Sequence, residues 1–185
     1  MKVIPGRDGF CNTKNISGKK KKGLLTKLNI MTKILVATEK PFASVAVNQM
    51  RQITEEAGFD LILLEKYKDQ SDLIGAAKQV DALIVRSDII DRQVINEANN
   101  LKIIVRAGAG YDNIDLVAAS EKGMVVMNTP GQNAEAVAEL VFGMMVYMAR
   151  NRFNGSSGTE LLGKKLGVQA YGNVGKRVAK IAKGF

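Results

Sequence analysis

From residue 33 onwards, short apolar segments alternate with segments of helical periodicity, and this alternation constrains the fold more than any other feature. The apolar segments have the length of strands and carry apolar side chains on both faces. Such strands are typical of a parallel sheet that helices cover on each side. We therefore expect an α/β fold with a flavodoxin-like layer of five parallel strands. The five segments are 33–38, 61–65, 82–87, 102–108 and 124–130.

Helix signals fill the intervals between these strands. A helix within 42–58 is expected to stop at Gly58, since glycine adopts the left-handed conformation that ends helices. A second helix, 71–80, opens on Ser71 as a candidate cap, and a third covers 91–100. A short fourth helix is predicted between Asp115 as its cap and Gly123.

The next helix, at 133–151, differs from the others because it is apolar nearly all round. Asn133 is its candidate cap, and between Ala134 and Ala149 its only charged residues are Glu135 and Glu139. A helix of this composition must be covered on most sides, so we expect it to lie between domains or between subunits. The Gly/Ser-rich stretch that follows, up to Lys165, indicates a boundary.

The net charge of +9 is concentrated at the start of the chain. Eight of the 27 Lys and Arg residues but only one of the 18 Asp and Glu residues lie in the first 32 positions. Residues 33–185 are therefore left with a net charge of +2. The segment 1–32 has no helical or strand period and is expected to be a disordered basic tail. Its lysine run has no interleaved aromatic residues, so we expect no nucleic-acid partner.

The same segment bears on the cellular compartment and on the translation start. A secretory leader needs an uninterrupted apolar core, which Lys27 breaks, and no apolar run approaches the roughly 20 residues of a membrane span. A single cysteine, Cys11, allows no internal disulfide. We therefore expect a cytoplasmic protein without a membrane partner. Met31 lies two residues before the first residue of the first strand, and we hypothesise that natural translation starts there.

The final twenty residues, LGVQAYGNVGKRVAKIAKGF, read as an apolar strand, a glycine turn and a helix. This is the order of the dinucleotide fingerprint G-x-G-x-x-G, whose second glycine admits the pyrophosphate and whose third allows close helix packing. Here Gly172 and Gly175 match, and Ala170 stands at the first glycine. Alanine fits there only if its φ is negative. Alone, this motif is equally typical of any strand–turn–helix unit.

Two further loops follow predicted strands, at the edge where open α/β sheets bind ligands. Arg86 and Ser87 end one strand, and Arg106 begins the loop RAGAGY of the next. Glycines allow backbone N–H groups of such a loop to converge on an anion, and two nearby arginines suit a phosphate or a carboxylate. Either loop alone could equally be a solvated turn, but the two together favour an anion site.

The segments ALIVRSD, LKIIVRAGAGYDNIDL, VVMNTPGQNAEAVAELVFGMM and GTELLGKKLGVQAYGNVGKRVAKIAKGF together resemble the D-isomer-specific 2-hydroxyacid dehydrogenase family. The resemblance runs from Met31 to Phe185. It implies a flavodoxin-like substrate domain interrupted by a Rossmann domain, and hydride transfer from C2 of 3-phosphoglycerate to NAD⁺, giving 3-phosphohydroxypyruvate for serine synthesis. It also implies a homodimer of the full-length enzyme, with the helix from Asn133 serving the hinge and the dimer contact.

The resemblance assigns roles to particular residues. For the substrate phosphate it implies Arg86, Ser87 and Arg106; for the carboxylate, the backbone of Gly108, Ala109, Gly110 and Tyr111, with Asn128 close by. For the NAD pyrophosphate it implies Tyr171, Gly172, Asn173, Val174 and Gly175. The sequence departs from many relatives at Ala170 and Asn173, where they have glycine and arginine. No metal site is expected.

The family's catalytic groups, a His–Glu pair and an arginine that polarises the C2 oxygen, have no counterpart here. The sequence contains no histidine. We therefore expect no catalytic residue in this chain, which would be the inactive N-terminal portion of a longer enzyme with an incomplete NAD site. The expected divisions are a tail (1–32), a substrate domain (33–132), a hinge helix with linker (133–163) and the start of a Rossmann domain (164–185).

Three alternatives remain open at this point. A sibling enzyme acting on glycerate, hydroxypyruvate or lactate would share the motifs, although paired arginines favour a phosphorylated substrate. A non-catalytic module could keep the fold in order to bind anions or to dimerise. A third interpretation uses the lysine run to bind nucleic acid.

Overall fold

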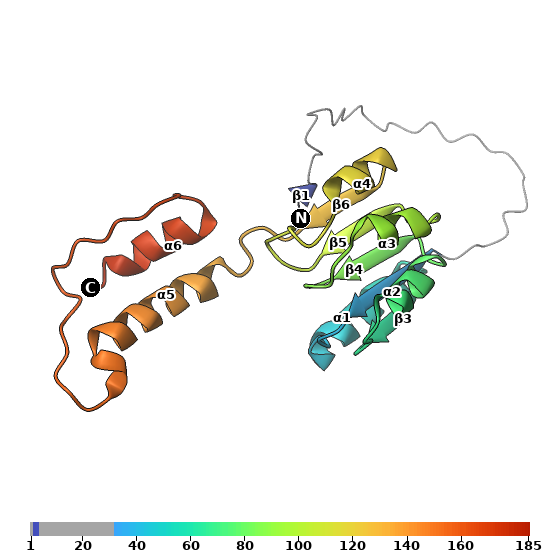
Figure 1. Cartoon of the computed structure of the whole chain (residues 1–185). Coiled ribbons are helices and arrows are strands. Elements are labelled where there is room, and N and C mark those ends of the chain that lie inside the picture. The colour runs from blue at the N-terminus through green and yellow to red at the C-terminus, as the bar shows by residue number, and fades with distance from the viewer. Residues whose placement is uncertain (1, 4–31) are drawn as a thin grey trace, which may run out of the picture. The chain divides into compact units, whose positions relative to one another are not determined.

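Five parallel strands form the centre of the N-terminal part of the protein (Figure 1). The computed structural model describes residues 2–3 and 32–185. The strands are β2 (Lys33–Thr38), β3 (Asp60–Glu65), β4 (Ala82–Val85), β5 (Ile103–Arg106) and β6 (Val125–Asn128). They lie in the order β3-β2-β4-β5-β6, and every neighbouring pair is parallel. Counted along the chain this is the flavodoxin-like order 2-1-3-4-5, so the predicted fold class is confirmed.

A sixth, two-residue strand extends the sheet at β6. β1 (Lys2–Val3) pairs antiparallel with β6, with Lys2 opposite Asn128. The prediction of a disordered tail is therefore wrong at these two positions, because the backbone of β6 offers an edge that a short strand can join. Residues 4–31, with Cys11, the lysine run and Met31, lie outside the described residues.

Four helices connect the parallel strands: α1 (Ser44–Glu56), α2 (Gln70–Ala77), α3 (Arg92–Glu97) and α4 (Leu116–Glu121). α2 contacts α3, and α3 contacts α4, which gives a continuous helical layer. Their apolar faces bury Leu73, Val94 and Ala118 against Leu83 and Ile104 of the sheet. Burying a leucine or isoleucine completely contributes about 1.5–3 kcal/mol, so this cluster fixes the sheet that carries the strand ends.

The helix boundaries test the predicted caps. Gly58 and Gly123 have φ of 71° and 66°, the expected left-handed stops. Asp115 accepts a hydrogen bond from the amide of Ala118 at 2.9 Å and caps α4 as predicted. Ser71 is not a cap, because α2 begins one residue earlier, after Asp69.

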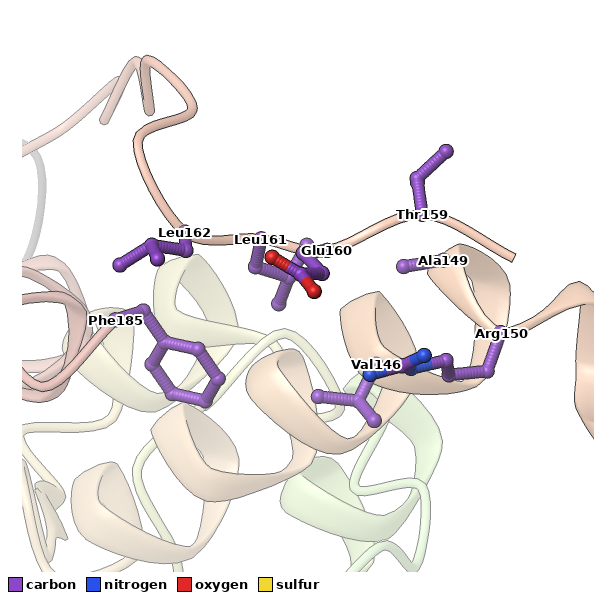
Figure 2. Close-up of a pocket in the computed structure, with 8 residues that line it drawn as sticks. All are labelled: Val146, Ala149, Arg150, Thr159, Glu160, Leu161, Leu162 and Phe185. Carbon is purple, nitrogen blue, oxygen red and sulfur yellow. The ribbon is translucent and has the colours of Figure 1, made fainter. Parts of the chain in front are cut away.

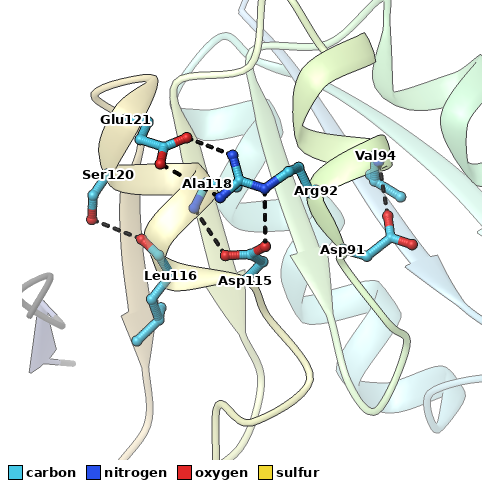
Figure 3. A network of polar contacts seen from close by, with 8 residues as sticks. All are labelled: Asp91, Arg92, Val94, Asp115, Leu116, Ala118, Ser120 and Glu121. Atoms are coloured by element: carbon cyan, nitrogen blue, oxygen red, sulfur yellow. Dashed lines mark hydrogen bonds and ion pairs between the residues drawn. The ribbon is translucent and has the colours of Figure 1, made fainter.

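An ionic cluster on the surface ties α3 to α4 (Figure 3). The Arg92 guanidinium donates to Glu121 at 2.5 Å and lies 3.7 Å from Asp115. The hydrogen bond to Glu121 raises the pKa of Arg92. These groups are exposed, and exposed ion pairs contribute little stability, so the buried apolar contacts dominate the joining of the two helices.

The C-terminal part consists mainly of α5 (Ala134–Ala149) and α6 (Asn173–Ala182), with the 3₁₀ turn η1 (Asn151–Phe153) after α5. Ala138 and Phe142 of α5 are buried with Val178 of α6. Asn133 occupies the N-cap position of α5 as predicted, but its side chain makes no cap hydrogen bond. Glu135, in the first turn of α5, instead forms an ion pair with Arg177 of α6 at 2.9 Å.

The strand predicted within 166–171 is absent from the described structure, which corrects one element of the expectation. A strand is defined by hydrogen bonds to a neighbour, and the residues described around α5 and α6 include no strand for this segment to join. The apolar sequence alone cannot supply such a neighbour.

The chain divides into two compact units, Met1–Asn128 and Thr129–Phe185. The helix expected to serve as a hinge, α5, belongs with α6 to the second unit. None of the helices described has both the length and the apolar character needed to cross a membrane.

Candidate functional site

In the N-terminal unit, the strand register brings three of the predicted site residues to one edge of the sheet. Val85 of β4 pairs with Arg106 of β5, and Val105 pairs with Met127 of β6. Arg86 and Asn128, each one residue beyond these pairs, therefore flank the end of β5 on its two sides. Side chains far apart in the sequence meet there because parallel strands end together.

Arg86 is held by the loop that follows β2. Its Nη1 donates to the carbonyl of Lys40 at 3.1 Å and to that of Pro41 at 3.3 Å. The guanidinium lies 5.2 Å from the centre of the Phe42 ring, within the range of a cation–π contact. No described carboxylate forms a salt bridge with Arg86. The cation is thus oriented by neutral groups, and within the described residues only its Nη1 donates a hydrogen bond, which leaves the Nε and Nη2 donors for an anion.

Arg106 lies against Gly108, which allows the close approach. A Cβ on Gly108 would overlap the Arg106 guanidinium. The Nε of Arg106 is buried and has no hydrogen-bond partner among the described residues. A buried, unsatisfied donor on a cation is costly, which makes it a strong candidate to receive an anionic ligand.

The loop after β5 presents a row of amides. The Gly108 amide donates to the Arg106 carbonyl at 2.8 Å, whereas no described protein acceptor takes the amides of Ala109, Gly110 or Tyr111. Asn128 donates through Nδ2 to the Ala109 carbonyl at 2.7 Å and so fixes the loop. Its buried Oδ1 has no partner among the described residues. Ser87 and Tyr111 are exposed at the same edge.

Sequence reasoning missed a buried carboxylate below this edge. Asp88 is only 3% exposed, and its side chain accepts hydrogen bonds from the Glu39 amide, the Tyr67 hydroxyl and the Arg86 amide. Burial and the hydrogen bond to Asp88 raise the pKa of the Tyr67 phenol well above its ordinary value, so Tyr67 remains a donor. The only signal in the sequence is the aspartate itself, two residues beyond Arg86, and the same pattern is common in exposed turns.

In the C-terminal unit, the glycine turn has the geometry that the fingerprint requires at two of its three positions. A Cβ on Gly175 would overlap the backbone oxygen of Ala170, so this glycine permits close packing of α6, as predicted. Gly172 precedes α6 and has open space around its Cα. Val174 packs against the cluster around Phe142, and Tyr171 is exposed.

The first position of the fingerprint, Ala170, has a φ of 66° and so fails the condition under which alanine fits without strain. Ala170 thus adopts the left-handed conformation that a glycine at this position would adopt without strain. Such a residue costs about 1–2 kcal/mol.

Replacement of Ala170 by glycine is therefore expected to raise the unfolding free energy of the C-terminal unit by about 0.5–1 kcal/mol, because the strain relieved exceeds the entropy that glycine adds to the unfolded chain. Hydrogen exchange of the α6 amides measures this change. Ala179→Gly, inside α6, is the control and should lower the same free energy by about 1 kcal/mol. A destabilising Ala170→Gly would contradict the strain.

The residues around the start of α6 fit the pyrophosphate of a dinucleotide. A cavity of about 300 Å³ opens there, lined by Gly131, Ala134, Asn173, Lys176 and Arg177. The Asn173 side chain lies against Gly131, which has a φ of 81°. The first amides of the helix and the Lys176 cation favour an anion, whereas Arg177 is already paired with Glu135. The open space at Gly172 lets an anion approach the backbone.

A second cavity of about 300 Å³ lies in the same unit, at the end of α5 (Figure 2). Its lining includes Val146, Leu161, Leu162 and Phe185, and the Phe185 ring stacks on Phe142 with 5.0 Å between ring centres. None of the residues of the glycine turn lines this cavity. Arg150, Thr159 and Glu160 complete its lining together with Ala149.

Comparison with known proteins finds similar dehydrogenases and reductases among both sequences and solved structures. The D-3-phosphoglycerate dehydrogenase of Methanocaldococcus jannaschii is 40% identical over 172 residues, covering 84% of this chain and 31% of the relative. The hydroxypyruvate reductase of Thermotoga maritima is 40% identical over 140 residues, covering 68% and 46% respectively. The solved structure of NAD⁺-bound 3-phosphoglycerate dehydrogenase from Entamoeba histolytica has 52% identity and a TM-score of 0.79, covering 83% of this chain and 51% of that one.

The chain thus spans about half or less of the length of each of these relatives. The family model described as D-isomer specific 2-hydroxyacid dehydrogenase, catalytic domain, matches residues 34–183. Together with the flavodoxin-like strand order and the glycine turn before α6, this match shows that the chain belongs to the D-isomer-specific 2-hydroxyacid dehydrogenase family.

Proposed function

We propose that the chain provides the substrate-anion site and the first part of the nucleotide site of an NAD-dependent D-3-phosphoglycerate dehydrogenase. The observation that carries the proposal is the pair Arg86 and Arg106 at neighbouring strand ends, neither in a salt bridge with a described carboxylate. A substrate with a phosphate and a carboxylate supplies the anions that these cations lack. The similarity to 3-phosphoglycerate dehydrogenases from several organisms supports the choice of substrate.

In this proposal, Arg86, Ser87 and Arg106 bind the phosphate. The amides of Ala109, Gly110 and Tyr111 receive the carboxylate, because they have no described protein acceptor. Gly108 contributes space for the Arg106 side chain, and its own amide is already bonded to Arg106. Asn128 holds the loop through Ala109.

The nucleotide would contact Tyr171, Gly172, Asn173, Val174 and Gly175 at the start of α6. NAD⁺, when bound, accepts the hydride from C2 of the hydroxy acid. The residues of this chain bind and orient its pyrophosphate through helix amides and open space at Gly172. Because the 185 residues contain no histidine, we expect no turnover of 3-phosphoglycerate by this polypeptide alone.

We also propose that α5 joins two subunits in the full-length enzyme. Its buried face packs on α6, whereas Leu140, Met144, Tyr147 and Met148 are between 43% and 61% exposed. These four positions recur at helical spacing and form one apolar stripe. A second copy covering this stripe would provide the cover that the helix lacks.

Titration of the chain with 3-phosphoglycerate and with D-glycerate tests the proposal. Each charge-assisted hydrogen bond contributes about 1.5–3 kcal/mol, so 3-phosphoglycerate should bind at least about tenfold more tightly. The readout is isothermal titration calorimetry, with NAD⁺ reduction followed in parallel. Equal affinity for the two compounds would refute the phosphate site, and measurable turnover would refute the absence of catalysis.

A hydroxypyruvate or glycerate enzyme is the second candidate, favoured by the similarity to the hydroxypyruvate reductase of Thermotoga maritima. Its substrate lacks the phosphate. Tighter binding of hydroxypyruvate than of 3-phosphohydroxypyruvate would select this alternative.

A further inference from the structure

Asp88 is a buried carboxylate whose presence the fold alone does not explain. It is 3% exposed, and no lysine or arginine among the described residues forms a salt bridge with it. Burying a charge without a counter-ion is unfavourable, and a neutral side chain would satisfy the packing at lower cost. Its negative charge also lies two residues from Arg86, where an anion is proposed to bind. Any benefit from Asp88 must therefore come from its geometry.

The two carboxylate oxygens of Asp88 accept hydrogen bonds from two backbone amides and one side-chain hydroxyl, which come from three different loops of the sheet. Oδ1 accepts from the Glu39 amide after β2 and from the Tyr67 hydroxyl after β3, both at 2.8 Å. Oδ2 accepts from the Arg86 amide at 3.1 Å. Asn113 reinforces the same place, since its Nδ2 donates to the carbonyls of Asp88 and Arg86.

The segment that Asp88 anchors is the one that orients the Arg86 guanidinium. Glu39 is followed directly by Lys40 and Pro41, whose carbonyls accept from Arg86 Nη1. The Lys40 carbonyl also accepts from the Thr38 hydroxyl at 2.7 Å, which fixes its direction. Asp88 thus holds both the backbone of Arg86 and the loop after β2 against which the Arg86 side chain lies.

We propose that Asp88 is a positioning residue for the phosphate site, which sets the direction of the Arg86 guanidinium through the Glu39 and Arg86 amides. The inference rests on the proposed function, because it concerns the same site. Tyr67 has a supporting part, since its hydroxyl donates to the oxygen that also receives the Glu39 amide.

Asp88→Asn is the sharpest variant. The asparagine oxygen can keep the position of Oδ1 with its two donors, which places the NH₂ group against the Arg86 amide, donor against donor. We expect the dissociation constant for 3-phosphoglycerate to rise about tenfold. If electrostatics alone acted, removing a negative charge near an anion site would relieve Coulomb repulsion and strengthen binding. The direction of the change in affinity therefore separates positioning from simple electrostatics.

Asp91→Asn is the matched control. It removes the same charge three residues further along, and asparagine caps α3 as well as aspartate does. Affinity for 3-phosphoglycerate should be unchanged in this variant. Tyr67→Phe, which removes one donor to Asp88, should weaken binding in the same direction as Asp88→Asn but by less.

A double-mutant cycle with Arg86→Ala distinguishes positioning from a general loss of stability. If Asp88 acts through Arg86, Asp88→Asn has no further effect on affinity once Arg86 is alanine. A further, additive loss would overturn the proposal, as would binding by Asp88→Asn as tight as that of the unaltered chain.

A measurement without ligand keeps the two proposals distinguishable. In Asp88→Asn, the Arg86 amide should exchange faster and the Arg86 Nε–H should gain mobility in ¹⁵N relaxation; in Asp91→Asn neither should change. Unchanged Arg86 signals would refute the positioning role even if 3-phosphoglycerate binds. Failure of the unaltered chain to bind 3-phosphoglycerate, with the Arg86 signals responding as expected, would refute the proposed function alone.

Discussion

Substitution of Gly175 by alanine is expected to lower the unfolding free energy of the C-terminal unit by about 2 kcal/mol. A Cβ at this position would overlap the backbone oxygen of Ala170, and backbone cannot move aside as a side-chain end can. Overpacking costs about 1–3 kcal/mol, and the rigid neighbour places this site at the upper end. Alanine regains up to about 1 kcal/mol through its higher helix propensity, which is not enough to change the sign.

Hydrogen exchange of the α6 amides measures this loss, because it reports the opening of that helix. Gly167→Ala is the matched control, because Gly167 lies in the same unit, shortly before α6. Its φ is outside the left-handed region, and there is open space for a Cβ. It should leave the exchange unchanged or slow it slightly. The displacement of Ala170 in Gly175→Ala should also weaken NAD⁺ binding, since the turn before Gly172 moves with it. Equal exchange in the two variants would contradict the close contact.

Substitution of Gly108 by alanine is expected to weaken 3-phosphoglycerate binding by about tenfold to a hundredfold while changing stability by less than about 1 kcal/mol. The atoms that a Cβ would meet belong to the guanidinium end of Arg106. This end of a flexible side chain can swing away, so the fold is preserved. The cation is then lost from the position in which its Nε is buried without a partner among the described residues.

Calorimetric titration and thermal unfolding on the same variant separate the two quantities. Gly75→Ala is the matched control, because Gly75 lies in α2 with no atom within 4 Å of a built Cβ. It should leave affinity unchanged and raise stability slightly through helix propensity. Unaltered affinity in Gly108→Ala would show that Arg106 does not contribute to the anion site in the conformation described.

Sequence periodicity was sufficient for the parallel sheet because each strand and helix carries its own signal. Residues 34–37 of the first strand are apolar without interruption, and Gly58 and Gly123 mark helix ends through a conformation that glycine adopts easily. Ser71 and Asn133 do not cap helices through their side chains, because α2 begins before Ser71 and the Asn133 side chain makes no cap hydrogen bond. The residue type alone favours a cap without fixing where a helix begins.

The predicted strand at 166–171 failed for a different reason. A strand forms only where a neighbouring strand accepts and donates its backbone hydrogen bonds. The apolar sequence of residues 166–171 does not reveal whether such a neighbour is present. Ala170 shows a related limit, since its conformation is set by the packing of Gly175 against its carbonyl oxygen rather than by its own preference.

The sequence by itself determined the fold class, the family and the strand ends at which Arg86 and Arg106 lie, since these depend on local periodicity and on motifs contiguous in the chain. Only the tertiary structure decided that Asp88 joins Glu39, Tyr67 and Arg86, and that Arg106 rests on Gly108 with a buried donor unsatisfied. The physical reason is that hydrogen bonds and close contacts depend on distances between residues up to 49 positions apart, and these distances exist only once the sheet has formed.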